Sequence, residues 1–158
     1  MIVSLHHERS SVAGRDAVTA PTFEVARAAI TDGGLEVFRV KDETIELAER
    51  VRSHLMDAGV SVTFGAQPSV QFTVRAQNSD FPGSAPEEMF SRVRNAVLSR
   101  AAAHGFSESD QRCRQIYDPV DDARVLDVWY ELTFSKAAHE LVQLMDDLRF
   151  ALSIKKSV

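Results

Sequence analysis

Two segments of alternating polar and apolar residues in the second half of the chain contain the residues best suited to binding chemistry. Arg112 and Arg114 lie in the first segment, and Asp127, Trp129 and Glu131 lie in the second. In an antiparallel hairpin with Arg114 opposite Trp129, Arg112 lies opposite Glu131, so these side chains share one face. A shift by one residue would place both arginines in the core, which is strongly unfavourable. Because tryptophan and arginine are enriched at the energetic centres of interfaces, this patch is predicted to bind a partner.

Two aromatic side chains have structural alternatives to a binding role. Trp129 is the only tryptophan, and it either anchors a partner or packs under the N-terminal arm or a loop. Phe81 lies in the polar loop 77–85 and is a further candidate for partner binding, because loops often carry function. Alternatively, Phe81 folds back onto the core.

The histidines have ordinary structural explanations. His54 and His104 are expected in the last turns of helices, where an imidazolium favours the dipole, and His139 is expected in the first turn of the final helix. His54 and Asp57 have the spacing of an acid–base pair on a helix, but a surface contact is the simpler interpretation. The chain has neither a phosphate-binding glycine loop nor a nucleophile elbow, so no catalytic residue is predicted.

Metal-binding patterns are weak as well. Cys113 is the single cysteine, which excludes an intramolecular disulfide and a cysteine-based zinc site. The acidic turn 118–122 lacks the spacing of an EF-hand loop, and aspartate favours turns on its own account. His6 and His7 are adjacent in the N-terminal arm, which is weak evidence for a metal ion. The sequence therefore predicts no metal and no cofactor.

Charge and length restrict the class of protein. The chain has 158 residues and a formal net charge of −5, with acidic and basic residues interspersed. A basic stripe for nucleic acid is missing, and no apolar run approaches a membrane span or a signal-peptide core. We therefore expect a cytoplasmic protein that binds neither nucleic acid nor membrane. Residues 22–158 are predicted to form a single α+β domain, preceded by an arm or short edge strand over 1–21.

The positions of turns and apolar residues predict the elements that hold the binding patch. Strands are predicted over 23–30, 35–40, 60–64, 70–76, 112–117 and 125–134, and helices over 43–58, 86–104 and 136–153. A helix is the alternative for Phe23–Ile30, because its alanines suit one. The order reads strand–strand–helix three times, which is consistent with ββα repeats.

These elements predict a mostly antiparallel sheet of five to six strands with the three helices on one face. The strands after Gly59 alternate between apolar and polar residues, whereas a sheet covered on both faces would contain continuous apolar runs. One face of the sheet is therefore expected to be open to water or to a partner.

The open face and the predicted patch indicate a non-enzymatic protein-interaction module, such as an inhibitor, an immunity-type factor, a chaperone or an adaptor. The partner would be another protein or a second copy of the chain. One alternative is a small-molecule sensor with Tyr117, Tyr130 and Cys113 lining a pocket. A less favoured alternative is a small enzyme that uses one of the histidines 54, 104 or 139 as general base.

Overall fold

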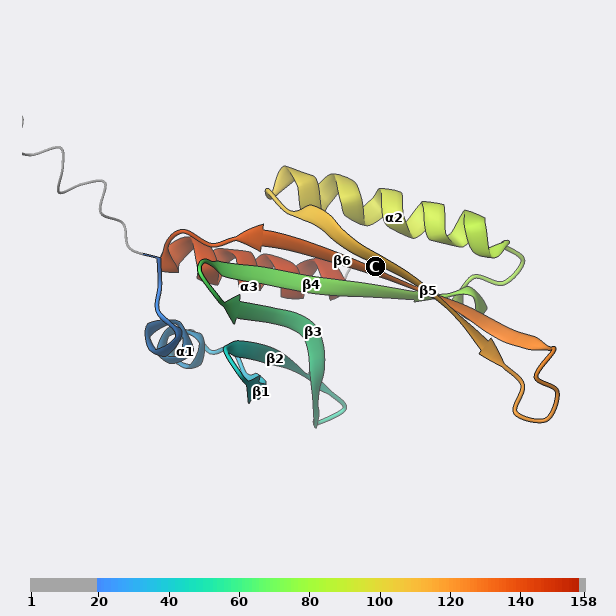
Figure 1. The fold of residues 1–158 in the computed structure, drawn as a ribbon, viewed down its shortest axis with the longest axis horizontal. Helices are drawn as coiled ribbons and strands as arrows, with labels where there is room; N and C mark the ends of the chain where they lie inside the picture. The colour runs from blue at the N-terminus through green and yellow to red at the C-terminus, as the bar shows by residue number, and fades with distance from the viewer. Residues whose placement is uncertain (1–19, 157–158) are drawn as a thin grey trace, which may run out of the picture.

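The computed structural model describes residues 20–156, which contain one six-stranded antiparallel sheet and three helices (Figure 1). The strand order is β1-β2-β3-β4-β6-β5. Along the chain the elements are α1 (Phe23–Asp32), β1 (Val37–Lys41), β2 (Thr44–Val51), β3 (His54–Phe64), β4 (Pro68–Gln77), the 3-10 turn η1 (Asn78–Asp80), α2 (Pro86–Ala103), β5 (Ser107–Tyr117), β6 (Val125–Ala137) and α3 (Leu141–Lys156). The predicted fold class is confirmed. Residues 1–19 of the predicted arm or short edge strand lie outside the described residues.

The sheet has one buried and one open face, as the alternation predicts. In β4, Val70, Phe72 and Val74 are buried, whereas Gln71 and Arg75 are exposed. The buried side chains of the neighbouring strands β3 and β6 join the same core as those of the helices. None of the described helices is both long enough and apolar enough to cross a membrane.

Helix α2 agrees with its predicted position and α3 begins later than predicted. Pro86 occupies the start of α2, where its missing N–H costs nothing, and the buried stripe consists of Met89, Val93, Val97 and Ala101. The predicted start of the last helix at residue 136 is wrong, because β6 continues to Ala137 and Ser135 pairs with Gln71 of β4.

The strand predicted over Phe23–Ile30 is wrong, and the alternative helix is what forms. The Thr22 hydroxyl accepts a hydrogen bond from the Val25 N–H at 3.3 Å, which caps the first turn of α1. Ala26 and Ile30 are buried four residues apart, on one face of the helix. Gly33 and Gly34 follow α1 and lead into β1 rather than closing a hairpin.

The helix predicted over 43–58 is also wrong, because this segment is a β-hairpin formed by β2 and the first half of β3. The turn between them lies at Arg52 and Ser53, which have φ values of 51° and 70°. Such left-handed residues are normally glycine or asparagine, so the sequence lacks the usual hairpin signal. The order is therefore one helix, four strands, a helix, two strands and a helix, and the ββα repeats do not form.

Gly59 allows the sheet to divide. It has φ +67° and lies where the pairing of β2 with β3 shifts register. Pairing of β3 with β4 ends at Val60 opposite Phe72, so the first half of β3 diverges from β4. The Lys155 ammonium reaches this fork from α3 and donates a hydrogen bond to the Ala58 carbonyl.

Replacing Gly59 with alanine should lower the free energy of unfolding by at least about 1–2 kcal/mol, the cost of a left-handed non-glycine residue. The added Cβ would also collide with the Lys155 ammonium. Urea unfolding measures the loss. Gly65→Ala is the matched control, since its Cβ would meet nothing within 4 Å. Equal effects of the two substitutions would contradict this role of Gly59.

Candidate functional site

The open face of the sheet contains a polar furrow made of three adjoining cavities that all include Thr73. Their volumes are about 170, 420 and 420 Å³. The lining side chains that define the furrow are Glu46, Asp57, Ser61, Gln71, Thr73, Arg75, Ser109, Asp110, Arg112, Glu131, Thr133 and Lys155. The furrow crosses β2, β3, β4, β6 and β5 and begins at the fork beside Gly59.

The predicted binding patch lies at the β5–β6 side of this furrow. Arg112 pairs opposite Glu131 and Arg114 opposite Trp129, so the predicted register of the hairpin is confirmed. Arg112 and Glu131 line the furrow itself. Arg114 is exposed on the edge strand β5. We use the name Trp129 patch for Arg75, Arg112, Arg114, Asp127, Trp129 and Glu131.

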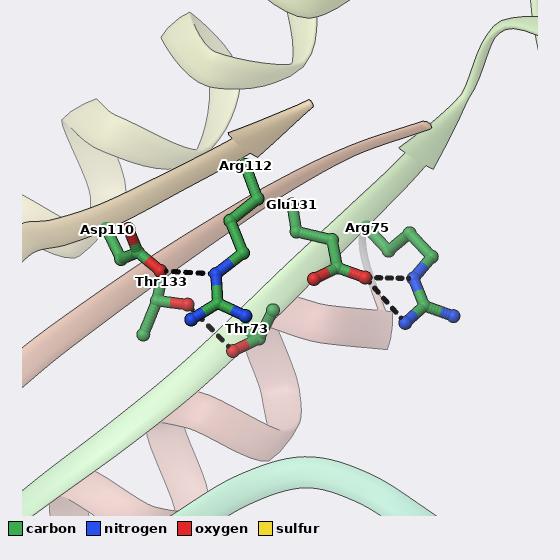
Figure 2. A network of polar contacts seen from close by, with 6 residues as sticks. All are labelled: Thr73, Arg75, Asp110, Arg112, Glu131 and Thr133. Atoms are coloured by element: carbon green, nitrogen blue, oxygen red, sulfur yellow. Dashed lines mark hydrogen bonds and ion pairs between the residues drawn. The ribbon is translucent and has the colours of Figure 1, made fainter. Parts of the chain in front are cut away.

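Charged and hydroxyl side chains on the floor of the furrow are joined in a network (Figure 2). The Arg75 guanidinium donates two hydrogen bonds to the Glu131 carboxylate, at 3.0 and 2.7 Å. Arg112 donates to Asp110 at 2.8 Å, and the hydroxyls of Thr73 and Thr133 lie 3.0 Å apart between the two ion pairs. Each of these four charged side chains is thus paired with an opposite charge.

Trp129 is half-buried by its own neighbours. The Arg75 guanidinium lies over the indole, 5.1 Å from the ring centroid, and the indole N–H donates to Asp127 at 3.2 Å. Asp127 also accepts hydrogen bonds from the Ser79 backbone N–H at 3.0 Å and from its hydroxyl at 2.7 Å. The indole is therefore fixed in orientation while part of its surface stays accessible.

The Ser79 hydrogen bonds hold the pKa of the Asp127 carboxyl below its ordinary value, and the N–H groups of Val128 and Trp129 act in the same direction. A carboxylate whose pKa is lowered by folding stabilises the folded state at pH values above its unfolded-state pKa. That contribution disappears as the pH falls through the folded-state pKa.

Asp127→Asn should therefore reduce stability at neutral pH and reduce the loss of stability on acidification. Urea unfolding from neutral pH down to about pH 2 would show a smaller decrease for the variant than for the wild type. Asp122→Asn, an exposed carboxylate in the neighbouring loop, is the control. Parallel pH profiles for wild type and Asp127→Asn would contradict the assignment.

The remaining predicted residues lie outside the furrow. Phe81 is half-buried and packs against the hydrophobic core, as its structural alternative proposed. Tyr130 packs against Phe90 with ring centroids 4.4 Å apart and planes tilted by 35°, whereas Cys113 and Tyr117 are exposed. These three candidate pocket residues are not among the side chains that line the furrow.

The three histidines of the described chain lie at different elements of the fold. His54 lies at the exposed start of β3 rather than in a helix, so its expected helical spacing with Asp57 is wrong. His139 is exposed and precedes α3, so its predicted place in the first turn of that helix is wrong; its Nδ1 lies 2.7 Å from the Gln67 Nε2. His104 follows α2, as predicted, and lies on the helical side of the sheet. His6 and His7 lie outside the described residues.

Sequence reasoning missed Arg75 and Lys155 as site residues. Arg75 alternates with apolar residues in β4, which places it on the open face, but its contact with Trp129 depends on β4 lying beside β6. Lys155 enters the furrow through the fork at Gly59, and burial lowers the pKa of its ammonium below the ordinary value.

Comparisons with known proteins found no relative: no family model matches the chain, and no curated protein or solved structure matches it. The class that the structure defines is an α+β protein with an antiparallel sheet whose helices lie on one face. Any function must therefore be inferred from the site itself.

Proposed function

We propose that the chain is a non-enzymatic protein-interaction module that binds its partner through the open face of the sheet. The observation that supports this most directly is the continuity of the furrow with the Trp129 patch, because Arg112, Glu131 and Arg75 belong to both. The helices cover the other face, so the open face is the broad surface that the sheet leaves to a partner.

The charge of the furrow favours a protein over a polyanion. Its lining contains four acidic side chains (Glu46, Asp57, Asp110, Glu131) and three basic ones (Arg75, Arg112, Lys155), a sum of −1. Nucleic acids are held mainly by clustered positive charge, which this face lacks. A partner with mixed charges can exchange ion pairs with the furrow, which sets register and rejects wrong partners.

Apolar side chains at two hairpin ends add area for association. Leu55 and Met56 are exposed on the β2–β3 hairpin, and Leu126 and Val120 are exposed around the β5–β6 turn. The β5–β6 hairpin extends beyond the helices (Figure 1). Exposed apolar groups beside a polar surface are typical of interaction sites, so both hairpins are expected to contact the partner at its periphery.

A small-molecule sensor remains a second candidate because of the cavity at the fork. This cavity of about 420 Å³ is bordered by Asp57, Thr73, Arg75 and Lys155. A partly buried ammonium beside hydroxyl and guanidinium groups suits a small anionic ligand. A rise in melting temperature with such a ligand, in the absence of any protein partner, would favour this second function.

Site-specific photocrosslinking tests the interaction surface. A photoreactive residue placed at Gln71, which is exposed on the open face, should capture one discrete partner or a second copy of the chain in cells of the source organism. The matched control is Val142, which is 79% exposed on α3. Light scattering on the purified chain then separates self-association from binding of another protein.

Equal capture from Gln71 and Val142, or no capture from Gln71, would contradict the proposal.

The enzyme alternative has its own test, in which His54, His104 and His139 are all replaced by glutamine. A fall in biological activity of about 100-fold with the fold intact is typical of losing a general base. Activity that stays within a few-fold of wild type supports the non-enzymatic function.

A further inference from the structure

A group of ionisable side chains lies on the helical side of the sheet, away from the furrow. The His104 Nε2 lies 3.3 Å from the Asp146 Oδ2 and 3.3 Å from the Asp147 Oδ1. Lys136 of β6 donates to the same Asp147 Oδ1 at 2.8 Å and to the His104 carbonyl at 2.9 Å. The group thus joins the end of α2 to β6 and α3.

Asp147 is the unusual member of this group. Its side chain is 1% exposed, and it is the single charged residue in the buried interior of the described chain. Oδ1 accepts a hydrogen bond from Lys136 and lies 3.3 Å from the His104 Nε2. The buried Oδ2 has no hydrogen-bond partner among the described residues. A buried carboxylate oxygen without a partner costs roughly 1–3 kcal/mol or more, so Asp147 is held in the interior at a penalty that a cation bound by its carboxylate would reduce.

The two separations from the His104 Nε2 to the carboxylate oxygens suit a tetrahedral metal ion. Bonds of about 2.0–2.2 Å to nitrogen and oxygen place tetrahedral ligand atoms about 3.3–3.5 Å apart. Both distances from the His104 Nε2 match this separation, and the three ligand atoms lie within 4.8 Å of one another. The His104 ring is held flat against Phe150, with centroids 3.9 Å apart and planes 1° apart, so its nitrogen is oriented in advance.

Charge and access also favour a divalent cation. Asp146 and Asp147 contribute two negative charges against the single ammonium of Lys136, which leaves one negative charge when the imidazole is neutral. Asp146 is 71% exposed, so an ion can reach the group from solvent. The arrangement therefore has a buried ligand, an oriented imidazole and an open side.

We propose that His104, Asp146 and Asp147 bind a divalent transition-metal ion of the Zn²⁺ class, with water completing the coordination. Imidazole with carboxylates is a donor set that suits zinc. The ion would fasten α3 to the end of α2, and Lys136 would keep its bond to Asp147 Oδ1. This site is separate from the interaction surface, and its test does not depend on the proposed function.

Calorimetric titration of the full chain with Zn²⁺ tests the proposal, with Co²⁺ absorption as a second readout. We expect one equivalent of Zn²⁺ to bind saturably and the visible Co²⁺ bands of a four-coordinate site to appear. Asp146→Asn should weaken binding at least about tenfold, since even outer partners of metal ligands change affinity by 10–100-fold. Because Asp146 is exposed, this variant should fold, and urea unfolding without metal verifies that.

Two further variants identify the ligands. His54→Gln removes an exposed histidine remote from the group and should leave binding unchanged. The double variant His6→Gln, His7→Gln removes the adjacent histidines near the N-terminus of the sequence and should also retain the equivalent of Zn²⁺. No saturable binding, binding lost with His6 and His7, or binding unchanged in Asp146→Asn would each overturn the proposal.

Discussion

Replacing Phe72 with alanine should lower the free energy of unfolding by about 3–5 kcal/mol, the range for a buried phenylalanine. Phe72 is fully buried in β4 and packs against three other aromatic rings. Its ring centroid lies 5.1 Å from those of Phe134 and Phe106 and 6.4 Å from that of Phe150. The cavity would therefore open where the sheet meets α3 and the chain after α2.

A loss of this size is a large share of the roughly 5–15 kcal/mol that stabilises a typical domain. Urea unfolding followed by circular dichroism measures it, with the slope of the transition checked for two-state behaviour. Phe38→Ala is the matched control, because Phe38 is 40% exposed on the edge strand β1. A loss below about 1 kcal/mol for Phe72→Ala would mean that the core closes around the cavity.

The parts of the fold that could be predicted from the sequence are those in which the spacing of apolar residues fits only one type of secondary structure. In β4 the alternation of Val70, Phe72 and Val74 with polar residues fits a strand and no helix. Pro86 and the acidic first turn fix the start of α2 in the same way. The β5–β6 register followed from the cost of burying arginine, and the structure agrees.

The segment 43–58 shows why the remainder could not be predicted. Leu47 and Ala48 are both buried although adjacent, because the pairing of β2 with β3 shifts there. The shift breaks the alternation and gives the segment helix-like spacing, and the turn at Arg52 and Ser53 has no glycine to reveal it. Residues 44–51 form a strand because they pair with β1 and β3, and local propensity carries no information about that pairing.

Part of the candidate site could likewise be predicted from the sequence, and part of it could not. The members of the Trp129 patch in β5 and β6 could be derived from one hairpin, whereas Arg75 joins them from β4. The furrow requires the neighbours β3 and β4, the fork at Gly59 and the entry of Lys155 from α3. The carboxylates of Asp146 and Asp147 likewise reach His104 through the packing of α3 against the end of α2, so helical periodicity does not reveal that group.

The Trp129 patch has the composition of an interface centre, and its preorganisation has a consequence for binding. Arg75 is already stacked on the indole and paired with Glu131, so a partner need not immobilise these side chains on association. Rigid side chains lose less conformational entropy on binding, and the association therefore keeps more of its interaction energy.

Trp129→Ala should accordingly weaken association by more than about 2 kcal/mol, a loss of roughly 30-fold in affinity. The substitution removes the apolar area of the indole and also the ring over which Arg75 lies, so the guanidinium would lose its fixed orientation. Calorimetry or light scattering with the partner captured from position 71 measures the loss. Because Trp129 is only half-buried, the free energy of unfolding should change less than the free energy of association.

Two variants separate binding from folding. Trp129→Phe keeps an aromatic surface for Arg75 and should retain most of the affinity. Phe38→Ala removes a more exposed ring on β1 and should not affect association. The competing explanation is that the indole serves the fold, under cover of the chain's own residues. Under that explanation Trp129→Ala would lower the melting temperature and leave association unchanged, and the interaction surface would have to be sought elsewhere on the molecule.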